Sequence, residues 1–228
     1  MQQLAFAAAA FFMLHRLISA SRLRGVLVRQ VGEATFRRLF QAASLFCLVW
    51  LIAGYRLALN WPGNRPLFDP AEFVRWIQWP LQYCALLLVI AGFTARNPAT
   101  AGMQDAVHED VIHGVLRITR HPFLWGVALM SAGHMLALPD LASWAFFGTL
   151  LFLAFTGTFS IDAKRRAALG TSWARFASET SNLPFKAILQ RRQRLSLREI
   201  GWRLPLLTLA AFALVIGAHV LVWKLVAH

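Results

Sequence analysis

The chain has 228 residues, of which 58% are hydrophobic and only 14% are charged, and its formal net charge is +13. Soluble domains draw about a quarter of their residues from Asp, Glu, Lys and Arg, so this composition excludes an ordinary soluble enzyme and indicates an integral membrane protein. Cys47 and Cys84 lie in apolar runs without metal-ligand spacing, which excludes a disulfide framework and a zinc knuckle.

Six apolar runs predict an all-α, polytopic integral membrane helix bundle that forms a single domain over residues 1–228. About 20 residues span the hydrocarbon core of a bilayer, and the first run is marginal by that measure. It lacks the basic head of a secretory signal, so we expect a retained helix. In chain order the runs are Leu4–Ser19, Leu39–Tyr55, Phe73–Phe93, Pro122–Leu138, Leu141–Ile161 and Leu204–Val226.

The distribution of basic residues predicts that the N-terminus lies outside the cell. With six spans in that orientation, 19 of the 23 Lys and Arg residues fall in cytoplasmic segments, in agreement with the positive-inside rule. Because these residues flank membrane segments, we expect them to contact anionic membrane lipids and not nucleic acid. The basic run Arg191–Glu199 predicts an amphipathic segment on the lipid surface.

Four histidines lie within or at the edge of the apolar runs, where ionisable residues are costly and often mark a functional site. They are His15, His121, His134 and His219. The alternative for each is a neutral imidazole that is hydrogen-bonded to a neighbouring helix. Because no carboxylate accompanies them inside the membrane, the set suits a haem better than a hydrolytic zinc site or a proton pump.

Three arginines are expected at the membrane edge, where cations can pair with the propionates of a haem. They are Arg16, Arg117 and Arg120. Asp162 begins the long basic segment after the fifth run. It is either a partner of Arg117 and Arg120 that helps to orient a cofactor or a surface ion pair worth less than about 1 kcal/mol, and the residues alone leave both open.

Three segments of the chain resemble one known family. They are "HRLISASRLRGVLVRQ" from His15, "GVLRITRHPFLWGVALMSAGHML" from Gly114, and "DAKRRAALGTSWARF" followed by "TSNLPF" from Asp162. They are similar to the NnrU family of bacterial membrane proteins, which is homologous to plant and cyanobacterial 15-cis-zeta-carotene isomerase. The resemblance runs through nearly the whole chain and implies a multi-pass protein of the bacterial inner (cytoplasmic) membrane.

The resemblance implies a haem b with His15 and His134 as axial ligands. It also implies an accessory role in nitrite and nitric oxide reduction, with nitric oxide or a nitrogen-oxide reductase system as partner. In the plant isomerase, a cysteine three residues before the second ligand is proposed to exchange with it. Ser131 stands at that position here, which argues against isomerase activity. A haem-dependent cis–trans isomerase of zeta-carotene or a related polyene is therefore an alternative.

The residues alone do not decide which histidine is the second haem ligand, because His15 and His134 are expected at different depths in the membrane. A rise of 1.5 Å per residue places His134 about 18 Å and His15 about 9 Å from the cytoplasmic edge. His121 is for this reason the reserve ligand. It precedes His134 by 13 positions, or about 220° around a straight helix, so His121 and His134 cannot face the same site.

Two further alternatives carry no haem. The Arg-His-Pro element at residues 120–122, with Asp162, Leu169, Gly170 and Trp173, is similar to S-adenosylmethionine-dependent membrane methyltransferases. The chain departs from their pattern, because Leu124 stands where a tyrosine is usual and Asp162 where a glutamate is usual. The other alternative is a cofactor-free assembly factor.

Overall fold

The computed structural model describes residues 1–18 and 22–226, and within these residues it is helical and contains no strand. The chain divides into two compact units. Unit 1 comprises residues 1–78 and 131–153, and unit 2 comprises residues 79–130 and the chain from residue 154 onward. Three helices contribute residues to both units, namely α4 (Phe73–Thr94), α5 (Pro122–Ala137) and α6 (Leu141–Glu179).

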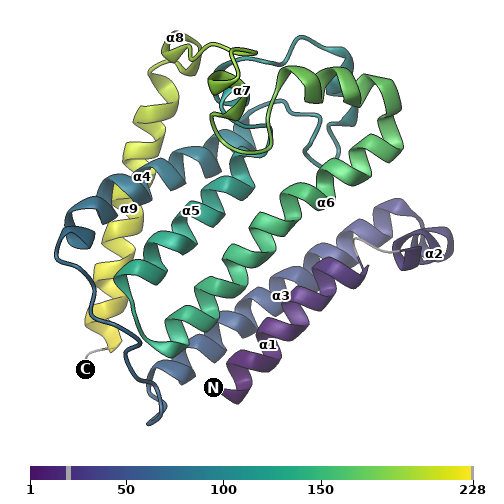
Figure 1. Cartoon of the computed structure of the whole chain (residues 1–228). Helices are drawn as coiled ribbons and strands as arrows, with labels where there is room; N and C mark the ends of the chain where they lie inside the picture. The colour runs from purple at the N-terminus through teal and green to yellow at the C-terminus, as the bar shows by residue number, and fades with distance from the viewer. Residues whose placement is uncertain (19–21, 227–228) are drawn as a thin grey trace. The chain divides into compact units, whose positions relative to one another are not determined.

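Unit 1 is built on α1 (Gln2–Met13) and α3 (Glu33–Leu59), which run side by side in opposite directions (Figure 1). A π-helical turn, η1 (Leu14–Ile18), extends α1, and α2 (Arg22–Val31) precedes α3. The two long helices approach closely where the chain has a glycine at position 54. Further along α3, Tyr55 and Ser143 of α6 share a hydrogen bond of 2.9 Å.

In unit 2, α4 and α5 cross closely because glycines take the place of side chains. A Cβ atom at Gly126 would lie 2.7 Å from the carbonyl oxygen of Ala85, and one at Gly92 would lie 2.5 Å from the backbone nitrogen of Phe123. Small residues let helices in an apolar environment pack backbone against backbone. The Tyr83 hydroxyl then donates to the carbonyl of Pro205 at 3.0 Å, which ties α4 to α9 (Arg203–Val226).

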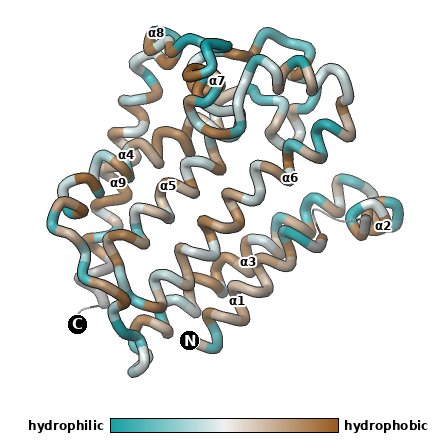
Figure 2. The backbone as a smooth tube through the Cα atoms, in the orientation of Figure 1, coloured by the Kyte–Doolittle hydropathy of each residue, from teal (hydrophilic) through white to brown (hydrophobic). Residues whose placement is uncertain are grey.

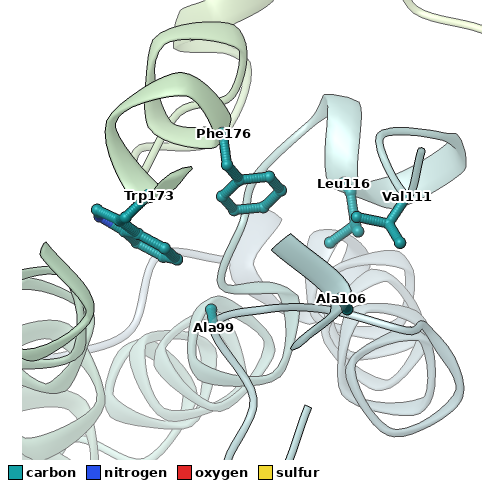
Figure 3. Close-up of a cluster of buried hydrophobic side chains, with 6 residues drawn as sticks. All are labelled: Ala99, Ala106, Val111, Leu116, Trp173 and Phe176. Carbon is teal, nitrogen blue, oxygen red and sulfur yellow. The ribbon is translucent and has the colours of Figure 1, made fainter. Parts of the chain in front are cut away.

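A bend at Gly170 divides α6 near its end. The residue has φ 52° and ψ −123°, a conformation that glycine adopts far more readily than other residues. Beyond it, Trp173 and Phe176 join a buried apolar cluster (Figure 3). The 3-10 helices η2 (Gln104–His108) and η3 (Gly114–Arg117) belong to the same part of unit 2. The cluster comprises Ala99, Ala106, Val111, Leu116, Trp173 and Phe176.

The segment between α6 and α9 contains two four-residue helices, α7 (Lys186–Leu189) and α8 (Leu197–Ile200). The predicted amphipathic run Arg191–Glu199 is therefore mostly irregular and ends in α8. Backbone hydrogen bonds hold this segment to the rest of unit 2. For example, Phe185 donates to the carbonyl of Ile118 at 2.9 Å.

Four helices of the described chain are long and apolar enough to cross a membrane, by length and composition. They are α3, α4, α6 and residues 203–221 of α9, and Figure 2 shows hydrophobic residues along them. Large apolar side chains on these helices are exposed, such as Trp76 at 78% and Leu214 at 75%. Exposure of apolar side chains to water costs free energy, whereas exposure to lipid does not. The apolar surface is therefore consistent with contact with membrane lipids.

The predicted all-α fold is confirmed within the described residues, and four candidate membrane-spanning helices agree with a membrane protein, whereas six spans and an external N-terminus are not confirmed. The first predicted run, Leu4–Ser19, yields a 12-residue α1 followed by the π-helical turn, and Ser19 lies outside the described residues. The fourth run yields the 16-residue α5, which ends before Pro139. Both helices fall short of the roughly 20 residues that a span requires. The orientation stays a prediction.

We expect Gly126→Ala to destabilise the protein by about 1–3 kcal/mol, because the new methyl group meets backbone atoms, which cannot move aside as a flexible side chain can. Gly217→Ala on α9 is the matched control, since a Cβ atom there meets nothing within 4 Å. Thermal unfolding in detergent should show a lower Tm for Gly126→Ala only. Equal Tm values for the two variants contradict a close α4–α5 crossing.

Candidate functional site

A charged cluster lies where α6 contacts the residues that lead into α5. The Arg120 guanidinium donates to both carboxylate oxygens of Asp162, with Nε at 2.9 Å from Oδ1 and Nη2 at 2.5 Å from Oδ2. Nε2 of His121 donates to Oδ1 at 2.7 Å. All three residues are buried. Removal of one member of a buried ion pair is far more destabilising than removal of a surface partner, so this cluster is a structural constraint as well as a candidate site.

The backbone around the cluster is held by the segment that follows α6. The Arg120 N–H donates to the carbonyl of Ser181 at 2.9 Å, and the Arg120 carbonyl accepts from the side chain of Asn97 at 2.9 Å. The Thr119 hydroxyl donates to the carbonyl of Asn182 at 2.6 Å. The Asn182 side chain in turn donates to Oδ2 of Asp162 at 3.2 Å. The cluster is thus fixed through both backbone and side chains.

The charge balance of the cluster favours a neutral imidazole. Burial lowers the pKa of His121 below its ordinary value, although the adjacent Asp162 carboxylate acts in the opposite direction. Arg120 already neutralises Asp162, so a second positive charge is not needed. With the proton on Nε2, the Nδ1 atom of His121 is an acceptor. Arg120 also lies over the ring of Trp173, 6.0 Å from its centroid, in a cation–π arrangement.

A cavity of about 290 Å³ opens beside the cluster. Small-molecule sites are usually apolar cavities with a few well-placed polar groups, and this cavity has that character at the low end of the usual size. Apolar side chains and backbone make up most of the wall, and Arg120, His121 and Asn97 supply polar atoms. The lining residues are Gly92, Phe93, Asn97, Ala99, Thr100, Ala101, Arg120, His121, Pro122, Phe123, Leu124 and Ile161.

Two buried polar atoms around the cluster lack a hydrogen-bond partner within the described chain. They are Nε1 of Trp173, a donor, and Oδ1 of Asn182, an acceptor. Buried polar groups are normally paired. These two residues contact Arg120 and Asp162, so they mark places where a water or a polar ligand group can bind.

His15 lies in unit 1, within the π-helical turn η1. Its Nδ1–H donates to the carbonyl of Phe11 at 2.8 Å, which leaves Nε2 unprotonated and able to bind a metal. Its ring lies 4.5 Å from the ring of Phe11 and 5.4 Å from that of Phe40. Single π-helical turns often occur at functional sites. The local geometry of His15 therefore fits an axial ligand of haem iron.

His134 also lies in unit 1, where it stacks on Phe147 with the ring centroids 4.5 Å apart. Phe12, three residues before His15, packs on Phe152. These two contacts with α6 are five residues apart, or about 7.5 Å along the helix. Metal–imidazole bonds are about 2 Å long, so two axial nitrogens lie about 4 Å apart. His134 and Phe12, the neighbour of His15, thus contact different turns of α6.

Arg117 lies apart from Asp162, because it contacts another carboxylate. Its guanidinium donates to both oxygens of Glu199 at 2.7 and 3.0 Å, and to the side chain of Gln193 at 2.5 Å. The predicted partnership with Asp162 thus holds for Arg120 alone. Of the remaining predicted residues, Arg16 follows His15 in η1 and is half-buried.

Across residues 1–18 and 22–226, no three His, Cys, Asp or Glu side chains gather in a group that could hold a metal ion. A haem iron needs only one or two axial ligands from the protein. The absence of such a group in the described residues therefore concerns sites for bare metal ions.

A scan against protein-family models matches residues 3–227 to the model described as NnrU protein. The chain belongs to the NnrU family. The match covers essentially the whole chain and confirms the resemblance carried by the three sequence segments. Comparisons with curated proteins and with solved structures find no match.

Sequence reasoning on this NnrU protein missed several polar partners of the cluster. Asn97 donates a hydrogen bond to the Arg120 carbonyl, and Asn182 donates one to Asp162. Glu199 accepts hydrogen bonds from Arg117. Each is separated from its partner by 20 or more positions. Two sequence features contain partners: the "TSNLPF" segment, which resembles the NnrU family, contains Asn182, and the basic run Arg191–Glu199 ends in Glu199.

We expect Asp162→Asn to destabilise this NnrU protein by about 3–5 kcal/mol, because it leaves Arg120 buried without a countercharge. Glu179→Gln is the control, since it removes a carboxylate of the same helix from the exposed Arg175–Glu179 pair and should change stability little. The measurement is the free energy of unfolding in detergent. Equal losses in the two variants contradict the structural role of the buried pair.

Proposed function

We propose that this NnrU protein is an accessory protein of nitrite and nitric oxide reduction in the bacterial inner membrane, and that it binds one haem b. The observation that carries the haem proposal is the geometry of His15, whose Nδ1–H is bound to the Phe11 carbonyl at 2.8 Å within a π-helical turn. Family membership supports the link to nitrogen-oxide metabolism, since the sequence resemblance to NnrU proteins implies it.

In this proposal, His15 is the fixed axial ligand and His134 is the second. Phe11 selects the tautomer of His15 that presents Nε2, and Phe40 packs against the ring. When bound, the haem supplies an iron centre that can change oxidation state and bind nitric oxide. The haem would link η1 to α5 through these two residues, and we propose that a change in its ligands would be the signal that this chain transmits.

The first test is the absorption spectrum of the protein purified in detergent with haem supplied during expression. We expect a Soret band that is lost in His15→Ala and altered in His134→Ala. His219→Ala is the matched control, because His219 makes the same type of bond, from Nδ1 to the carbonyl four residues earlier at 2.8 Å, but is exposed on α9. Its spectrum should equal that of the unmodified protein.

Other results of the absorption measurement support the alternative functions. A colourless protein contradicts the proposal and favours the cofactor-free assembly factor. A Soret band that survives in His15→Ala places the ligand elsewhere, and His121→Ala then tests the reserve ligand. Conversion of a cis-zeta-carotene precursor by the coloured protein assigns it to the isomerase alternative in place of the accessory role.

The cluster in unit 2 favours a second candidate function, the binding of S-adenosylmethionine. Arg120 and His121 are 42 and 41 residues from Asp162 along the chain, yet they contact it directly. Trp173, from the same methyltransferase-like element, is fully buried under Arg120. The adjacent cavity of about 290 Å³ offers both apolar walls and polar atoms. Four of the residues whose likeness suggested this function, Arg120, His121, Asp162 and Trp173, thus form one connected cluster.

This candidate is tested by equilibrium dialysis with labelled S-adenosylmethionine. We expect binding to the unmodified protein and its loss in Ile161→Trp, because the larger side chain fills the cavity that Ile161 lines. Phe159→Trp is the control, since Phe159 lies on the same helix, is half-exposed and does not line the cavity. Absence of binding to the unmodified protein ends this candidate and leaves the haem proposal untouched.

A further inference from the structure

A second cavity of unit 2, of about 510 Å³, is surrounded by arginines. Arg117, Arg191, Arg192 and Arg194 line it, and Glu199 is its single carboxylate. Four positive charges around one negative charge repel one another unless an anion is present. The positive charge is thus in excess at this cavity.

Two of the four arginines have structural partners. Arg117 is bound to Glu199 and Gln193, and Arg192 donates to the carbonyls of Thr180 and Ser178. Arg191 and Arg194 are exposed, and neither side chain has a hydrogen-bond or ion-pair partner within the part of the chain that the structure describes. The first two residues therefore build the cavity wall, and the second two are available to a ligand.

The backbone holds Arg191 in an uncommon conformation. Its φ is 58°, in the left-handed region that glycine usually occupies where a helix ends. The N–H of Arg191 donates to the carbonyl of Ile188, and that of Arg192 to the carbonyl of Ala187, both at 2.9 Å, so the turn is hydrogen-bonded. Strained non-glycine residues cluster at ligand sites. An arginine at a glycine position is consistent with a role for its side chain.

The surroundings of the cavity point to a lipid as the source of the anion. Leu197 and Trp202 follow the arginines in the chain and are 72% and 69% exposed. Trp202 immediately precedes α9, one of the four apolar helices, and tryptophan is typical of the membrane interface. Figure 2 shows the hydrophilic residues of the α7–α8 segment close to hydrophobic ones. Phosphate-binding and acyl-contacting groups thus lie together.

We propose that Arg191 and Arg194 bind the phosphate group of an anionic phospholipid at this cavity, with Arg117 and Arg192 as its structural support. The Glu199 carboxylate has a pKa lowered to about 2, chiefly by the hydrogen bonds from Arg117. It therefore stays charged at physiological pH and keeps Arg117 in place. The two ligand-binding arginines, Arg191 and Arg194, belong to neither the haem nor the S-adenosylmethionine proposal, and Arg117, which the sequence placed near a haem propionate, is held here by Glu199.

The test uses the full-length protein in detergent, titrated with short-chain phosphatidylglycerol, phosphatidylcholine or glycerol 1-phosphate. We expect phosphatidylglycerol to bind most tightly, and Arg191→Gly and Arg194→Gln each to weaken its binding by about fivefold. Arg198→Gln is the matched control, because Arg198 is exposed in the same segment and does not line the cavity. It should leave the affinity unchanged.

Arg191→Gly also separates binding from folding. Glycine suits a φ of 58° better than arginine does, so this variant should unfold at the same Tm as the unmodified protein, or higher, without lipid. Equal weakening in Arg198→Gln overturns the proposal in favour of diffuse attraction to a charged surface. Equal affinity for glycerol 1-phosphate overturns the lipid assignment, and unchanged affinity in both cavity variants overturns the site.

Discussion

A carboxylate that is buried within unit 2 organises the surrounding chain. Asp162 accepts hydrogen bonds from Arg120, His121 and Asn182, which come from two different segments of the sequence. A buried charge is tolerated only when its partners are in place. The segments on either side of η3 and after α6 must therefore adopt their observed paths together, and the cavity beside the cluster is a consequence of that requirement.

The apolar cluster beneath this ion pair supports the same arrangement. Trp173 is fully buried, packs with Phe176 and lies under Arg120. It reaches that position because Gly170 bends the end of α6. The Trp173 ring is buried in the apolar cluster, and its face also contacts the Arg120 guanidinium. It therefore connects the hydrophobic core to the charged site. The two interactions stabilise each other and restrict Arg120 to one orientation.

The histidines serve different chemistry in the two units. In unit 2, Asp162 occupies Nε2 of His121, which makes that imidazole part of the ion-pair network. In unit 1, the bond from His15 to a backbone carbonyl leaves Nε2 available, and His134 stacks on an aromatic ring. The expectation that His121 and His134 have separate roles therefore agrees with their separate contacts.

Much of this protein could be predicted from local properties of the sequence. Apolar composition and run length determine helices and a membrane environment, because burial of apolar surface depends on residue type. The Arg-His-Pro element and Asp162 could also be selected as a candidate site. Only the tertiary structure decided that Arg117 contacts Glu199, that Arg191 adopts a left-handed turn, and that α1 and α5 are too short to count as spans. Partners 82 positions apart and backbone strain depend on how distant segments pack, and such packing leaves no periodic pattern along the chain.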